Sequence, residues 1–171
     1  MNSAKRPEPW LRGTLREVPA VHRAVLHSLE LCQEDLLAWC AQLNTQEWNA
    51  SPGGMAPVAF QVRHIARSID RLLTYAEGRQ LDETQLAALK SELTAGAVPE
   101  EVLAEIRSAL ERAAQRVRAL AGADLEEQRT VGRQALPTTL GGLLVHVAEH
   151  TQRHVGQAVT TAKLIHAARH E

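Results

Sequence analysis

The sequence predicts an all-α fold in which four long amphipathic helices pack into one bundle. Apolar residues recur every three or four positions in four segments of the 171-residue chain, and no stretch alternates convincingly between apolar and polar residues. The seven prolines lie outside these segments or at their starts, where a missing N–H costs little. These observations favour a helix bundle made by a single domain, residues 1–171.

Each helix can be placed from its apolar face and from residues that start or stop helices. An N-terminal arm, residues 1–16, is expected to be extended or partly ordered. A short extra helix is expected in LDETQLAALKSEL, between the second and third long helices, because Asp82 followed by Gln85 matches a capping box. Gly78 and Gly122 are expected to end the second and third long helices. The four long helices are expected at residues 19–43, 58–77, 99–121 and 139–168.

Charge and composition exclude several classes of protein. Nineteen basic and twenty acidic residues give a formal net charge of -1, so no basic surface for nucleic acid or for an anionic membrane is expected. No apolar run is long enough for a secretory signal or a membrane span. Cys32 and Cys40 lie too far apart along one helix to form a disulfide and are expected to be buried thiols. We therefore expect a cytoplasmic protein with no nucleic-acid partner and no membrane partner.

Histidines gather in the fourth long helix, where residues 146–157 read HVAEHTQRHVGQ. His154 falls in the apolar seam of this helix, and His150 lies one turn earlier and slightly to its side. An i, i+4 histidine pair on one helix face can bind a single metal ion. His64 adjoins the apolar face of the second helix and is the obvious third ligand. We therefore expect a metal site made by His64, His150 and His154. The other histidines outside this helix are expected to be solvated surface residues: His22, His27, His166 and His170.

Two other kinds of metal site have partial matches in the sequence. Residues 146–150, HVAEH, match the H-x-x-E-H pattern of one class of zinc proteases, in which Glu149 is the base, but few residues follow for a further ligand. A di-iron bundle needs Glu-x-x-His on two helices, and no glutamate of this sequence has a histidine three residues after it. The first reading is disfavoured and the second is excluded.

At these residues the sequence resembles the DinB/YfiT-like superfamily of four-helix metalloproteins. The resemblance is carried by the last-helix motif HTQRHVGQ, residues 150–157, by His64 on the second helix, and by the segment EWNASPGGMAPVAFQVRHIARSIDRLLTY that leads into it. It implies an up-down-down-up bundle, often a homodimer, that binds a divalent ion such as zinc or nickel through three histidines. Characterised members of this family include transferases and isomerases that use low-molecular-weight thiols.

Several neighbours of the three histidines could orient the ligands. Glu149 and Asp70 could each hold an imidazole, and Gln157 lies one helical turn after His154. The resemblance implies a supporting role for His146 as well. Three arginines beside the ligands could receive a substrate carboxylate, although helix arginines are commonly just solvated: Arg63, Arg67 and Arg153.

Three neutral imidazoles leave a bound ion its full charge and an open position, which suits activation of a thiol or of water. We expect a metal-dependent enzyme of the thiol-transferase or isomerase type, acting on a small-molecule thiol and an electrophilic substrate. Two alternatives stay open. The protein could be a metal-dependent hydrolase, or the ion could be structural in a non-catalytic dimerisation or interaction protein.

Overall fold

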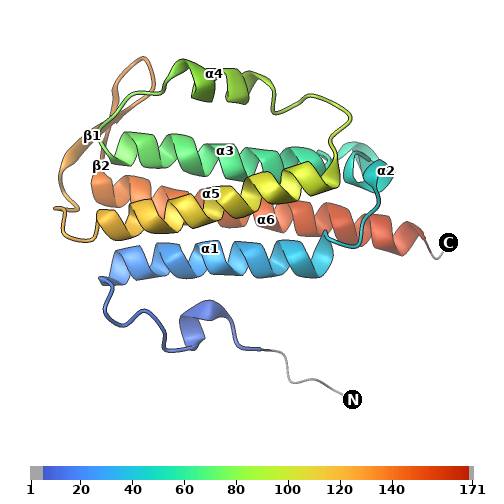
Figure 1. Cartoon of the computed structure of the whole chain (residues 1–171), viewed down its shortest axis with the longest axis horizontal. Helices are drawn as coiled ribbons and strands as arrows, with labels where there is room; N and C mark the ends of the chain where they lie inside the picture. The colour runs from blue at the N-terminus through green and yellow to red at the C-terminus, as the bar shows by residue number, and fades with distance from the viewer. Residues whose placement is uncertain (1–5, 170–171) are drawn as a thin grey trace.

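The computed structural model describes residues 6–169 and shows a four-helix bundle. Its long helices are α1 (Ala20–Trp39), α3 (Val58–Ala76), α5 (Pro99–Ala119) and α6 (Leu140–Ala168). Helices α1 and α6 run in one direction and α3 and α5 in the other, so the order is up-down-down-up (Figure 1). Helix α6 packs against both α1 and α3, and α5 packs mainly against α3. The expected fold class is confirmed.

Short elements connect the long helices. The 3-10 turn η1 (Pro9–Leu11) precedes α1, and between α1 and α3 lie helix α2 (Thr45–Trp48) and the 3-10 turn η2 (Pro52–Gly54). The expected extra helix is α4 (Glu83–Lys90), and Asp82 and Gln85 form the capping box that the sequence indicates. No helix within residues 6–169 is long and apolar enough to cross a membrane.

Helix α1 ends at Trp39, earlier than its apolar pattern predicts. The chain turns from Cys40 and then enters α2. Asn44 is the N-cap of α2, and its side chain accepts a hydrogen bond from the Glu47 N–H in a second capping box. Leu43 is still buried, which explains why it extends the apolar pattern beyond the helix.

The connection between α5 and α6 differs from the loop expected there. Strands β1 (Gln128–Val131) and β2 (Leu136–Thr139) pair antiparallel, with Gln128 opposite Thr139. Each strand has only four residues, and β2 contains Pro137, which removes a backbone donor. Such short strands carry too little alternation to be recognised. The hairpin leads directly into α6, where the Thr139 side chain accepts a hydrogen bond from the Gly142 N–H at 3.1 Å.

The core lies along the line where the four helices meet, and two histidines belong to it. His22 is 1% exposed and its Nε2 lies 3.0 Å from the backbone oxygen of Leu120. His27 is 7% exposed, and its Nε2 lies 3.2 Å from the Thr14 hydroxyl. The expectation that these two histidines are solvated was wrong, because the end of α5 supplies a polar partner to His22 and the N-terminal arm supplies one to His27. Cys32 and Cys40 are buried, as expected.

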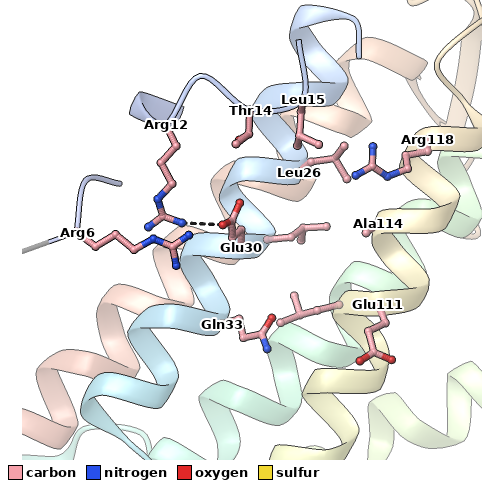
Figure 2. A pocket seen from close by; sticks show the side chains of 12 residues that line it. Arg6, Arg12, Thr14, Leu15, Leu26, Glu30, Gln33, Glu111, Ala114 and Arg118 are labelled. Atoms are coloured by element: carbon pink, nitrogen blue, oxygen red, sulfur yellow. Dashed lines mark hydrogen bonds and ion pairs between the residues drawn. The ribbon is translucent and has the colours of Figure 1, made fainter. Parts of the chain in front are cut away.

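The described part of the N-terminal arm packs along α1 (Figure 1). Arg12 anchors it by ion pairs to Glu30 at 2.6 Å and Glu34 at 2.7 Å. Between this arm, α1 and α5 lies a cavity of about 330 Å³ (Figure 2). Its floor is leucine-rich and its charged rim includes the Arg12–Glu30 pair, so it lacks the converging ligands that a metal ion requires.

Candidate metal centre

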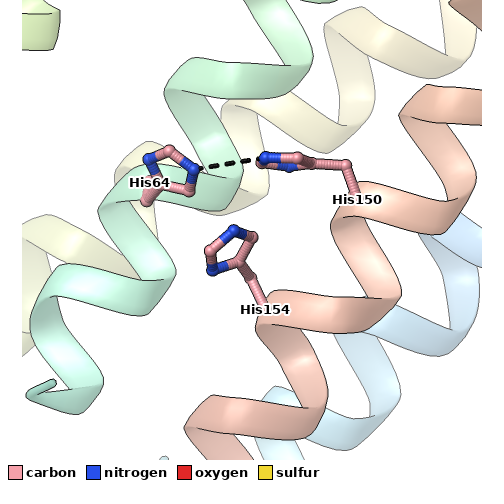
Figure 3. A group of neighbouring side chains, drawn as sticks. All are labelled: His64, His150 and His154. Atoms are coloured by element: carbon pink, nitrogen blue, oxygen red, sulfur yellow. Dashed lines mark hydrogen bonds between the residues drawn. The ribbon is translucent and has the colours of Figure 1, made fainter. Parts of the chain in front are cut away.

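Helices α3 and α6 bring three imidazoles together at their interface. His64 comes from α3, and His150 and His154 come from successive turns of α6 (Figure 3). One ligand nitrogen from each ring lies within 4.8 Å of the others, and the Nε2 atoms of His64 and His150 are 3.4 Å apart. Two nitrogens of a tetrahedral zinc site are separated by about 3.3 Å, given Zn–N bonds of about 2.05 Å. The spacing therefore fits a shared divalent ion.

The orientation of His64 is fixed by a carboxylate. Its Nδ1 lies 2.7 Å from Oε2 of Glu92, in the turn after α4, and the other oxygen of Glu92 accepts a hydrogen bond from Arg71 at 2.6 Å. A carboxylate only accepts hydrogen bonds, so Nδ1 of His64 carries the proton. In the neutral ring, Nε2 then holds a lone pair, and this atom faces His150. This carboxylate–histidine arrangement is the one that orients many metal-binding imidazoles.

His154 is oriented in a similar way by an amide. Its Nδ1 lies 2.7 Å from Oε1 of Gln61, a side chain that is only 3% exposed. Nδ1 donates to this oxygen, which leaves the Nε2 lone pair available to an ion. Nδ1 of His150 is buried and has no hydrogen-bond partner among the described residues. Nδ1 of His22 and Nε1 of Trp48, both away from the cluster, are also buried without a partner within residues 6–169, so this feature alone does not mark a site.

Two of the three imidazoles are held neutral. Burial, together with the nearby His154 and His64, lowers the pKa of His150 to about 4. Burial also lowers the pKa of His154 to about 4, with His64 and Arg153 contributing. At neutral pH these rings are unprotonated, which is the form that binds metals.

Of the residues predicted to support the ligands, His146 and Gln157 lie near them, whereas Asp70 does not. His146 lies edge-on to His150, with ring centroids 5.3 Å apart, and Gln157 lies close enough to His154 to raise its pKa slightly. Asp70 contacts none of the three histidines, because Arg116 and Gln85 bind its carboxylate at 2.7 and 2.6 Å. The role expected for Asp70 was therefore wrong.

Glu149 likewise contacts none of the three histidines. It is exposed and pairs with Arg153 one turn along α6, and one of its oxygens lies 3.7 Å from Nδ1 of His146. This geometry also opposes the protease reading of HVAEH, since Glu149 does not face the cluster and His146 lies outside the group of converging ligands.

The arginines near the ligands already have partners. Arg63 donates to the Thr94 backbone oxygen at 2.9 Å, and Arg67 pairs with Glu105 at 2.7 Å. Since Arg153 pairs with Glu149, none of the three guanidinium groups expected to receive a substrate carboxylate is without a partner.

None of the other histidines and cysteines within residues 6–169 joins this cluster. His166 is half-buried, with Nε2 3.2 Å from the Trp39 backbone oxygen, and His170 lies outside the described residues. Burial raises the pKa of the Cys40 thiol to about 12 and raises that of Cys32 as well, so both thiols stay protonated and unreactive.

Sequence reasoning missed the two side chains that hold the ligands. Gln61 left a signal, because it is a polar residue one turn before His64 in an otherwise apolar stretch of α3. Glu92 left none, since it lies 28 positions from His64 in a segment whose path depends on tertiary contacts.

Comparison with known proteins shows the family and the fold of the chain. A sequence model of the DinB superfamily matches residues 28–158, most of the chain. The chain belongs to the DinB superfamily. Among solved structures it is similar to YfiT from Bacillus subtilis, described as a probable metal-dependent hydrolase with an unusual four-helix bundle topology. The identity is 19%, the TM-score is 0.62, and the match covers 84% of this chain and 87% of YfiT. This likeness shows the shared DinB-like fold. Comparison with curated proteins gave no match.

Proposed function

We propose that this DinB-like protein is an enzyme that binds one divalent metal ion through His64, His150 and His154. The observation that carries the proposal is the convergence of three imidazole nitrogens, two of them fixed as lone-pair donors by Glu92 and Gln61. No fourth histidine, cysteine or carboxylate in residues 6–169 joins them, which leaves a coordination position for a reactant. Zinc and nickel both suit imidazole ligands.

The surroundings of the cluster favour a catalytic ion over a structural one. Ile65 follows His64 and Val147 lies one turn before His150; both are fully buried, so apolar packing contributes to the interface of α3 and α6 that carries the ligands. A structural zinc, by contrast, is closed and contributes folding free energy. His64 is 18% exposed, so the cluster lies at the edge of the core within reach of solvent.

The side chains of the site are equipped to hold an ion and not to attack a substrate themselves. A bound divalent ion lowers the pKa of a water molecule to about 7 and deprotonates a coordinated thiol, which supplies the nucleophile. The neutral rings of His150 and His154 add no charge to the site, and Glu92 holds His64 in place through its Nδ1 proton. The ring of Phe60 stacks on that of His64, with ring centroids 5.6 Å apart.

Beside the site lies a cavity of about 270 Å³ that includes Phe60 and Glu92 in its lining. Its volume is near the lower end of the range for pockets that bind small molecules. The other lining residues mix polar and apolar groups, among them Ser51, Thr94 and Leu93. None of the three histidines lines this cavity, so it would hold a part of a small substrate that lies away from the ion.

Two classes of reaction follow, hydrolysis by activated water and transfer of a small-molecule thiol. The description of YfiT as a probable metal-dependent hydrolase supports hydrolysis, and thiol transfer is what the resemblance to characterised family members implies. The experiment is a parallel screen of zinc- or nickel-loaded protein, with esters, amides and phosphoesters on one side and bacterial thiols with electrophiles on the other. We expect turnover that needs the metal and is absent from His154→Ala. Metal uptake without turnover in either screen, together with unfolding on metal removal, would favour the structural alternative.

A further inference from the structure

In the segment between α3 and α5, leucine side chains are exposed and a glutamate side chain is buried, which is the reverse of the usual pattern. We call residues 82–95 the strap; it contains α4 and runs along the outside of α3 (Figure 1). Helix α4 buries none of its side chains, and Leu89 and Leu93 of the strap are 43% and 79% exposed. Glu92 is the strap's one buried residue, at 5% exposed. Burying a carboxylate while a neighbouring leucine is exposed costs stability, so the arrangement requires another explanation.

Polar contacts with one face of α3 hold the strap down. Arg63, Arg67 and Arg71 follow one another at four-residue spacing on this helix and all donate to the strap. Arg67 donates to the backbone oxygen of Ala88 at 2.8 Å, in addition to its pair with Glu105. Arg63 donates to the backbone oxygen of Thr94 at 2.9 Å, and Arg71 donates to the Glu92 carboxylate at 2.6 Å. The strap is therefore attached by hydrogen bonds and ion pairs, which break locally at lower cost than a buried apolar interface.

Glu92 contacts both the arginine series of α3 and the metal centre. Its two oxygens bind different partners: Oε1 accepts from Arg71 of the arginine series and Oε2 accepts from Nδ1 of His64. One carboxylate thus makes two hydrogen bonds. The bond from Arg71 secures the strap, and the bond from Nδ1 of His64 leaves Nε2 as the metal-binding nitrogen.

We propose that Glu92 is a positioning residue that couples the strap to the metal centre: the docked strap orients His64 for the ion, and the bound ion in turn fixes the strap. The coupling is reciprocal because an ion on Nε2 makes Nδ1–H a stronger donor to Glu92, and linkage requires equal effects in both directions. This inference rests on the proposed metal site and deepens it. It assigns the strap as an element whose local stability responds to metal.

Three variants test the coupling by two readouts, neither of which is enzyme activity. Glu92→Leu removes both hydrogen bonds and puts an apolar side chain in a buried position. Glu92→Gln keeps an oxygen that can accept from His64 but loses the charge. Glu105→Gln is the matched control, because it also removes a carboxylate from an arginine of the same series without touching a histidine. The readouts are the Zn²⁺ dissociation constant, by competition with a chromophoric chelator, and hydrogen exchange of the amides of residues 82–95 with and without Zn²⁺.

We expect Glu92→Leu to weaken Zn²⁺ binding by about 10- to 100-fold, Glu92→Gln to weaken it less, and Glu105→Gln to bind like the wild type. Saturating Zn²⁺ should slow strap exchange in the wild type and in Glu105→Gln, and not in Glu92→Leu. Equal Zn²⁺ affinity in the wild type and Glu92→Leu would overturn the coupling and leave the metal site standing. An equal loss in Glu105→Gln would overturn the role of Glu92, by showing that the loss does not depend on its hydrogen bond to His64. A wild type that binds no Zn²⁺ would overturn the metal centre itself.

Discussion

Replacing Gln61 with leucine isolates the contribution of one buried hydrogen bond to the metal centre. Gln61 is 3% exposed and accepts from Nδ1 of His154 at 2.7 Å, so Gln61→Leu leaves this N–H without its acceptor at nearly constant volume. A buried donor left unpaired costs about 1–3 kcal/mol, and the lower end is expected because His154 is only partly buried. For a chain of this size, each kcal/mol corresponds to about 2–4 °C in Tm. The metal-free variant should therefore melt a few degrees below the wild type.

The larger effect is expected on metal binding. Loss of the group that orients a metal-binding imidazole typically weakens affinity by about 10- to 100-fold, which corresponds to about 1.4–2.7 kcal/mol. At equal free Zn²⁺ above both dissociation constants, the rise in Tm caused by the metal should be smaller in Gln61→Leu by about 3–11 °C.

The assay is thermal unfolding of matched metal-free and zinc-loaded samples. Gln61→Glu retains an acceptor oxygen and should keep most of the metal-induced rise in Tm. Gln152→Leu is the matched control on the other side of α6, because Gln152 donates to the Ser28 backbone oxygen at 2.8 Å and lies away from the ligands. An identical metal-induced rise in the wild type and Gln61→Leu would refute the argument that Gln61 sets the binding form of His154.

Three further predictions concern pH, the neighbouring histidine and the start of α6. The pKa values of His150 and His154 fall from 6.5 to about 4 on folding, so the unfolded chain binds more protons between these pH values. The stability of the metal-free protein should therefore decrease as pH is lowered from about 6.5 to about 4 and should then lose this dependence; urea unfolding across that range measures it, and a flat profile would contradict the lowered pKa values. His146→Ala should change Zn²⁺ affinity by less than about tenfold in chelator competition, because His146 touches His150 without holding it by a hydrogen bond; a larger loss would make it a ligand or an essential support. Thr139→Ala should lower stability by about 1 kcal/mol through loss of the α6 cap and leave Zn²⁺ affinity unchanged, as paired denaturation and titration would show.

The bundle could be predicted because its helices carry their burial pattern in consecutive residues. Val62, Ile65 and Ile69 define the buried face of α3 at helical spacing, and all three are at most 1% exposed. The histidine cluster was also within reach of the sequence, since His150 and His154 are one turn apart and His154 interrupts an apolar seam. The apolar spacing of α3 and the histidine spacing of α6 are each visible within the residues of one helix.

The features that sequence reasoning missed depend on contacts between distant segments. Glu92 reaches His64 across 28 positions, and His22 meets the Leu120 backbone oxygen across 98. No pattern within one helix encodes such partners, so a buried histidine and a solvated one look alike in the sequence. The assignment of Asp70 failed for the same reason, because Arg116, 46 positions away, binds its carboxylate.

Metal content tests the central claim most directly. Wild type, His64→Ala and His154→Ala would each be incubated with Zn²⁺, passed over a desalting column and analysed for bound zinc by elemental analysis, with circular dichroism to show that each variant is folded. Three converging imidazoles predict about one ion per chain in the wild type and a large loss of bound zinc in both variants. Zinc retained equally by folded wild type and folded variants, or by none of the three, would contradict the claim that these histidines share an ion.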